Sequence, residues 1–266
     1  MRTLACVALV AITLSGCNQP AAPSAPAATS VETPRVAPAP WQPAAFRLEG
    51  KTLPRDFQGN DGRAFGQLFE EISKKAAKGE YETSAAHRQR LQNLKAALSP
   101  IDPAEEYAFV VPGVLFEYDA DRQAYMPQTG YCGYADSWAT TDHPDPACTI
   151  AKSISQTNVP SGRFPNIGDY YALVIPQKTA GHFLKNGSWS ARCPVPVAHA
   201  RELAGSTIEY ALVGRVTGAE GIRVPDDTNT PGTFLWGHGI PFAPSRLICF
   251  VRETGEVLSS TSFAAR

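Results

Sequence analysis

His238 stands in the most unusual stretch of the sequence, TFLWGHGIPF at 233–242. The glycines on both sides of it allow either a tight turn or the close approach of a ligand to the backbone. An imidazole can act as a general base near neutral pH. Asp226 and Asp227 shortly precede it and are candidate carboxylate partners in a hydrolase. The alternative, a β-bulge or turn with an exposed histidine, is favoured because no partner nucleophile can be named.

Aromatic side chains form a second group of candidate residues, in the segment TGYCGYADSW at 129–138. Rigid aromatic faces on a loop fixed by a disulfide could stack on sugar rings or anchor a protein partner. Packing of the rings over the disulfide is the simpler interpretation. The binding candidates are Tyr131, Tyr134 and Trp138, together with Trp236 beside His238.

Few other residues have a spacing that suggests chemistry. The sequence contains no G-x-S-x-G, G-x-G-x-x-G or P-loop string, so the common nucleophile elbow and phosphate-binding loops are not expected. DADRQAY at 119–125 lacks the glycine and glutamate that an EF-hand loop requires, and a hairpin turn is expected there instead. No pair of cysteines or histidines has the spacing of a zinc site. We therefore expect neither a metal nor another cofactor.

The chain begins with a short apolar segment that ends at Cys17. Residues 4–14 are apolar and Arg2 is the only charge before them, and about eleven residues are too few for a membrane-spanning helix, which needs roughly 20. This pattern predicts a signal peptide. Its end, Leu14-Ser15-Gly16-Cys17, resembles the lipobox of bacterial lipoprotein precursors.

The lipobox resemblance implies that the chain is cleaved after Gly16 and that Cys17 carries acyl chains that insert into a lipid bilayer. Asn18 follows the cysteine where an aspartate would favour inner-membrane retention. The resemblance therefore implies that the mature chain is anchored at the periplasmic face of the outer membrane. An ordinary secretory signal with a coincidental cysteine is the alternative.

Composition divides the rest of the chain into a tether and one domain. Residues 17–45 follow the signal peptide (1–16) and consist mostly of Pro, Ala, Ser and Thr, a composition that cannot bury enough apolar surface to fold. In a polyproline II conformation this spacer would span roughly 85 Å. Residues 46–266 have no second linker and are expected to form a single domain.

The charge balance argues against nucleic acid as a partner. The chain has 24 basic and 25 acidic side chains, and removal of residues 1–16 deletes only Arg2. A surface so close to neutral lacks the basic patch that binds phosphate backbones.

Four cysteines remain for the exported domain after Cys6 is removed with the signal peptide and Cys17 is acylated. An even number in an oxidising compartment predicts two disulfides. Sequence alone leaves three pairings open. We favour Cys132 with Cys148, which closes a polar loop, and Cys193 with Cys249, which joins two predicted strands.

Apolar periodicity predicts helices near the beginning of the domain. Residues 61–78 repeat apolar positions at helical spacing, with Asp61 as the cap and Gly79 as a left-handed stop. A second helix is expected from Thr83 or Ser84 to Leu98, with His87 packed and hydrogen-bonded on its apolar face. One further short helix is expected at 196–205.

From about residue 107 the apolar period changes toward two, which predicts strands. They are expected near 107, 114, 123, 149, 169, 182, 188, 208, 245 and 256, with hairpin turns at 119–122, at Asn186-Gly187 and at 253–255. The fold class is therefore α+β: two helices at the beginning of the domain, followed by a largely antiparallel sheet and one further short helix.

Three short segments resemble parts of uncharacterised bacterial envelope lipoproteins: KGEYETSAAHRQRL, FEYDADRQAY and RETGEVL. This resemblance implies a location in the bacterial cell envelope, and it does not identify a named family. Together with the tether, they favour a binding module that is lipid-anchored and contacts a protein partner or the cell-wall polymer. A peptidoglycan or peptide hydrolase, a structural component of an envelope complex and an immunity-type inhibitor remain the alternatives.

Overall fold

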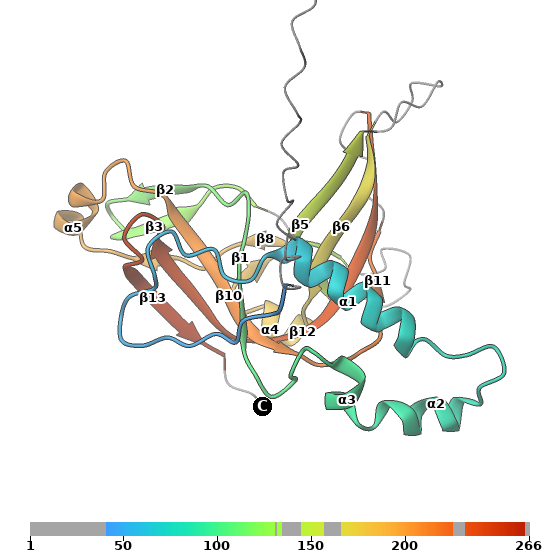
Figure 1. Cartoon of the computed structure of the whole chain (residues 1–266). Coiled ribbons are helices and arrows are strands. Elements are labelled where there is room, and N and C mark those ends of the chain that lie inside the picture. Colours follow the sequence, from blue (N-terminus) through green and yellow to red (C-terminus); the bar gives the residue numbers. More distant parts are fainter. Residues whose placement is uncertain (1–40, 131, 135–144, 157–165, 226–231, 264–266) are drawn as a thin grey trace, which may run out of the picture. The chain divides into compact units, whose positions relative to one another are not determined.

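The computed structural model describes residues 41–130, 132–134, 145–156, 166–225 and 232–263. They belong to one compact unit that begins at Trp41 (Figure 1). The helices are α1 (Gly62–Ala76), α2 (Ser84–Leu91), α3 (Leu94–Leu98), α4 (Gln177–Ala180) and α5 (Val197–Glu202). The strands are β1 (Tyr107–Val110), β2 (Phe116–Asp119), β3 (Ala124–Pro127), β4 (Gly133–Tyr134), β5 (Pro146–Gln156), β6 (Asn166–Val174), β7 (Leu184–Lys185), β8 (Ser188–Trp189), β9 (Cys193–Pro194), β10 (Ile208–Val216), β11 (Ile222–Arg223), β12 (Thr233–Val251) and β13 (Val257–Ser262).

A central sheet organises the fold. Its strand order is β1-β10-β12-β6-β5-β4, with β11 and β13 also paired to β12. The β6–β12 pair is parallel and the remaining pairs of this sheet are antiparallel. Smaller sheets are formed by β2-β3-β9 and by β7-β8. The expected α+β class with a largely antiparallel sheet is confirmed.

Strand β12 connects the two halves of the central sheet. Its first part, Thr233 to Pro241, pairs with β6, and its second part, Phe242 to Val251, pairs with β10. The segment 233–242 is therefore a strand, and the expectation of a bulge or turn around His238 is wrong. The glycines and Pro241 concealed this strand because they are residues that sequence patterns associate with turns.

Helix α1 forms as the apolar spacing predicts. The side chain of Asp61 accepts hydrogen bonds from Arg63 N (2.8 Å) and Ala64 N (3.0 Å), which satisfies two amides of the first turn. Phe65, Phe69, Ile72 and Ala76 form the buried face. This face packs against β5, β6 and β12, so the helix lies across one side of the sheet (Figure 1).

The end of α1 differs from the expectation. The helix stops at Ala76, and Gly79 is not a left-handed cap, because side chains of α2 bind the last carbonyls instead. His87, which is buried, donates to Ala76 O at 2.9 Å, and Arg90 donates to the same oxygen at 3.2 Å. Hydrogen bonds from Arg90 and then from Gly79 N lower the pKa of Glu82 to about 2.

The second expected helix is divided in two. Helix α2 ends at Leu91, and Asn93 caps α3 by accepting a hydrogen bond from Ala96 N at 3.2 Å. An asparagine side chain competes for backbone amides in this way and starts a new helix rather than continuing the old one. The described part of the chain therefore has three helices before the first strand, where two were expected. Two more, α4 and α5, lie between later strands, where one was expected.

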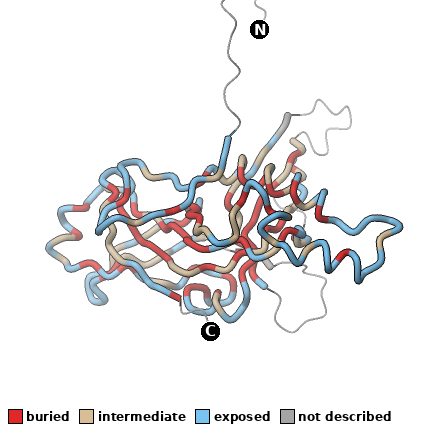
Figure 2. Tube along the Cα trace, turned by 60° about the horizontal axis from the view of Figure 1, so that its bottom comes forward, coloured by how far each residue is buried: buried red, intermediate tan, exposed pale blue. Residues whose placement is uncertain are grey.

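Both faces of the central sheet are buried over most of its length (Figure 2). The largest apolar cluster lies on the side of α1 and includes Tyr171, Leu173, Ile240 and Phe242. A second cluster covers the other face of β1, β10 and β12, and includes Phe46 and Leu53 from the segment before α1. A third, around Leu235 and Val224, lies behind β6 and the first part of β12.

Both disulfides pair as favoured. Cys132 bonds to Cys148 of β5, and Cys193 of β9 bonds to Cys249 of β12. All four cysteines are buried. The second bond attaches the β2-β3-β9 sheet to the central sheet.

The folded unit also includes residues that were assigned to the tether. The ring of Trp41 lies 6.2 Å from that of Phe65, and Ala44 exchanges two hydrogen bonds with the buried side chain of Asn60. Order thus begins at least five residues before residue 46. Among the described helices, none has both the length and the apolar character needed to cross a membrane.

Candidate functional site

The register of β6 and β12 brings four polar or aromatic side chains to one face of the sheet. Tyr171 is the register neighbour of His238, and Asp169 is the neighbour of Trp236. Because side chains alternate along a strand, these four residues point to the same side. It is the side of α1, since Tyr171 packs against the backbone of Gly66.

His238 is held by two of these residues. Its Nε2 donates to Asp169 Oδ1 at 2.8 Å, and its ring stacks on Tyr171, with centroids 5.4 Å apart. The hydrogen bond to the carboxylate places a proton on Nε2, so Nδ1 carries the lone pair whenever the ring is neutral. The side chain is 30% exposed. The histidine is therefore oriented and still reachable from solvent.

Helix α1 supplies the second wall of the site. The Tyr171 hydroxyl donates to Glu70 Oε2 at 3.3 Å, and Lys74 Nζ lies 2.8 Å from Glu70 Oε1. Burial acts to raise the pKa of Glu70, but the hydrogen bond with Lys74 and the charges of His238 and Lys74 together lower it. Burial raises the pKa of the Tyr171 hydroxyl, which remains a donor.

The glycines beside His238 make room on the opposite face. A Cβ on Gly237 would lie 2.4 Å from a methyl of Val224, and one on Gly239 would lie 2.5 Å from Ile222 O. Strand β11 pairs with β12 here in antiparallel register. These glycines serve close packing behind the strand, while His238 points to the other side.

A cavity of about 330 Å³ opens in front of His238. It lies between α1, β11 and β12 and is lined by Phe69, Glu70, Ser73, Gly221, Ile222, Arg223, Gly237, His238 and Gly239. The hydroxyl of Ser73 accepts a hydrogen bond from Gly221 N at 2.7 Å. Within the described residues, Ser73 is not hydrogen-bonded to His238, so no nucleophile and base are paired.

The structure brings only some of the predicted site residues together. His238 and Trp236 lie two residues apart on the same face of β12, and Trp236 is 46% exposed. Tyr134 belongs to β4, and its side chain lies outside the part that the structure describes. The predicted residues outside the described ranges are Cys17, Tyr131, Trp138, Asp226 and Asp227.

The carboxylates that accompany His238 were missed by sequence reasoning. Asp169 lies in a predicted strand and Glu70 on the polar side of a predicted helix, and both positions are ordinary for such residues. One available signal was the alternation in DYYALV, which places Asp169 and Tyr171 on the same face. No group of three or more histidine, cysteine or acidic side chains with metal-binding geometry occurs among the residues described.

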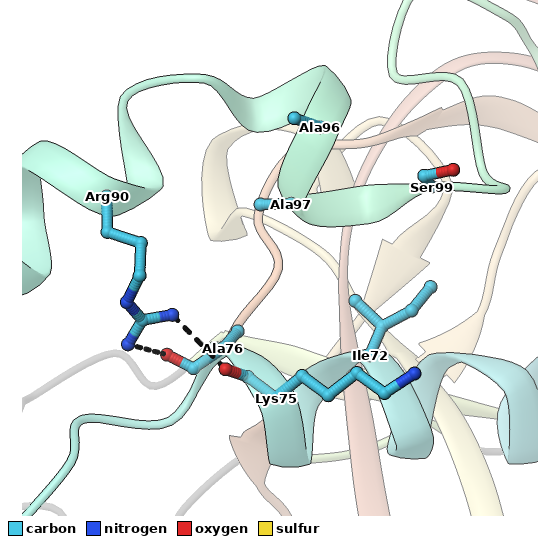
Figure 3. A pocket seen from close by; sticks show the side chains of 7 residues that line it. All are labelled: Ile72, Lys75, Ala76, Arg90, Ala96, Ala97 and Ser99. Atoms are coloured by element: carbon cyan, nitrogen blue, oxygen red, sulfur yellow. Dashed lines mark hydrogen bonds between the residues drawn. The ribbon is translucent and has the colours of Figure 1, made fainter.

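A second cavity of about 320 Å³ lies between α1 and the helices that follow it. Figure 3 shows its lining residues, including Ile72, Lys75 and Arg90. Arg90 donates to Lys75 O at 3.1 Å and pairs with Glu82 at 2.9 Å. Its donors thus cap α1 and its charge is balanced, which assigns this arginine a structural role.

Comparison of the chain with protein-family models, with curated proteins and with solved structures finds no match.

Proposed function

We propose that this chain is a bacterial lipoprotein whose acylated Cys17 holds it at the periplasmic face of the outer membrane. Its folded domain acts as a binding module for a protein partner or the cell-wall polymer. The observation that supports binding is the cavity in front of His238, where polar side chains of α1, β11 and β12 line one concave surface and Asp169 of β6 orients the histidine. Fixed polar groups around a concave surface are typical of ligand sites.

Binding explains the geometry better than hydrolysis does. A hydrolase needs a nucleophile within reach of its base, whereas Ser73, the hydroxyl residue that lines the cavity, makes no hydrogen bond to His238 among the described contacts. His238 and Asp169 alone provide an oriented donor and acceptor. Such a pair suits recognition of a polar ligand.

Site-directed photo-crosslinking in living cells tests the binding function. A photo-reactive residue at Arg223, which is exposed and lines the cavity, should form a defined adduct with a protein or with cell-wall material. The matched position is Tyr81, which is 92% exposed in the connection between α1 and α2. Adducts at both positions to the same extent, or at neither, would contradict a specific site.

The lipid anchor is tested separately by metabolic labelling. Wild-type chain should incorporate labelled palmitate, and Cys17→Ser should give a larger, unlabelled precursor, because the acyl acceptor and the cleavage signal are lost together. Cys6→Ser keeps the box intact and should be labelled normally. Normal labelling of Cys17→Ser would refute acylation at this residue.

A further inference from the structure

The central sheet continues past α1 and carries a polar and aromatic row there. Figure 1 shows α1 crossing β5, β6 and β12, which extend beyond it. Ser153 of β5, Asp169 of β6 and Trp236 of β12 are successive register neighbours. A hydroxyl, a carboxylate and an indole therefore lie side by side on one face, next to the row that contains Tyr171 and His238.

Trp236 presents an exposed indole that packs edge-on against a neighbouring ring. Its indole is 46% exposed, and the ring of Phe234 meets it at 5.1 Å with an angle of 80° between the planes. The exposed part of the indole stays in water, so it adds nothing to folding stability and is available to a ligand. An indole has only two side-chain torsions, so it can bind a ligand with little loss of side-chain entropy.

Asp169 can accept further hydrogen bonds beside this indole. Its Oδ1 accepts from His238 Nε2, and the side chain is 39% exposed. A carboxylate has about four lone-pair positions, so oxygen sites remain for donors from a ligand. The hydroxyl of Ser153, on the other side of Asp169, can donate or accept.

The described charges around the row are mixed in sign. Lys74 lies within ion-pair distance of Glu70 and Glu71, His238 is hydrogen-bonded to Asp169, and Arg223 adds a cation at the cavity wall. The carboxylates on and beside the row repel a polyanion, which needs several cations. This arrangement suits a ligand that is rich in hydroxyl groups and carries little charge.

We propose that the row Ser153–Asp169–Trp236 binds a pyranose ring of a glycan chain. The C–H face of the sugar stacks on Trp236, because polarised C–H bonds are attracted to the negative face of an aromatic ring. Neighbouring hydroxyls of the sugar donate to Asp169 and exchange hydrogen bonds with Ser153. Together with the His238 row, the surface measures roughly 10 Å by 7 Å, the scale of one or two sugar rings.

The same surface is small for a protein partner. A stable protein interface covers about 800 Å² on each side and centres on several aromatic or arginine anchors, whereas this row has one strongly exposed ring. The inference rests on the proposed binding function and names the class of ligand. A protein adduct in the crosslinking experiment without sugar binding would overturn the inference and leave the function standing.

The test uses the purified, acylated full chain in detergent micelles. Two probes are used: purified peptidoglycan sacculi in co-sedimentation, and soluble oligomers of N-acetylglucosamine in a titration that yields Kd. Trp236→Ala should weaken binding by roughly tenfold or more, because the stacking surface is lost. Trp236→Phe keeps an aromatic face and should recover part of the affinity. Asp169→Ala should also weaken binding.

Tyr81→Ala is the matched control, since it removes an exposed aromatic ring far along the chain from the row and should leave Kd unchanged. Thermal melting confirms that each variant is folded before its affinity is compared. Wild-type chain that binds neither probe overturns the proposal. Equal affinities of the wild type and folded Trp236→Ala overturn it as well.

Discussion

Gly66 sets the distance between α1 and the sheet at the candidate site. An added Cβ would lie 2.1 Å from Tyr171 Cγ. Helix propensity alone predicts that Gly66→Ala stabilises α1 by about 1 kcal/mol. We expect the opposite, a loss of about 2 kcal/mol in unfolding free energy, because the methyl group pushes the helix away from the ring. Denaturant titration of the full chain measures this difference.

Gln67→Ala is the control for the same helix, since Gln67 is exposed. Its effect should stay within about 0.5 kcal/mol. A Gly66→Ala variant that is more stable than wild type would mean that the helix backbone does not contact Tyr171.

At the residue level, sequence identified His238 and Trp236 as unusual but did not identify Asp169. Asp226 and Asp227 were chosen because they are near in sequence, and they lie outside the described residues. Asp169, a hydrogen-bond partner of His238, lies 69 residues away. The parallel register of β6 and β12 creates this contact. Register depends on packing of distant segments, so a local pattern does not contain it.

His199 ties helix α5 to the β12–β13 hairpin. Its Nδ1 lies 2.9 Å from Glu202 Oε2, and its Nε2 lies 2.8 Å from Glu256 Oε1. Hydrogen bonds to Glu202 and then to Glu256 raise the pKa of His199 above its usual value of 6.5. Its charged form therefore stabilises the fold. This contribution is complete below the unfolded pKa and is lost as pH rises through the folded pKa.

His199→Gln should therefore lower Tm more at about pH 6 than at about pH 9. Thermal melting of the full chain at the two pH values measures the difference. Arg201→Gln, at an exposed position of the same helix, should change Tm little at either pH. A loss for His199→Gln that grows with pH would show that the two carboxylates do not stabilise a charged ring.

Elements with strong periodicity were predicted well. Helix α1 follows its apolar spacing, and the hairpin of β7 and β8 turns at Asn186 and Gly187, both at positive φ. The division of α2 from α3 was missed because Asn93 sits within an otherwise helical pattern. The first part of β12 was missed because Gly237 and Gly239 satisfy packing that only the assembled sheet reveals.

The whole molecule depends on two disulfides that close loops of different length. Cys132 and Cys148 are 16 residues apart, and Cys193 and Cys249 are 56 apart. In the chain-entropy model these cross-links contribute about 3 and about 4 kcal/mol. Replacing Cys193 and Cys249 by alanine should therefore cost about 1 kcal/mol more than replacing the other pair.

Equilibrium unfolding of the two double variants under non-reducing conditions checks this order. The four half-cystines are equally buried, which makes each double variant a control for the other. The opposite order would show that the chain-entropy model does not describe these cross-links.

The first part of β12 pairs with β6 and β11, and its second part pairs with β10 and β13. Neither half of the sheet can therefore open without breaking hydrogen bonds of this shared strand. Amide hydrogens near Ile240 and Phe242, where the two halves meet, would then exchange with deuterium only through global unfolding. The proposed sugar-binding row in one half and the strands β1, β10 and β13 in the other would gain and lose their protection as one cooperative unit.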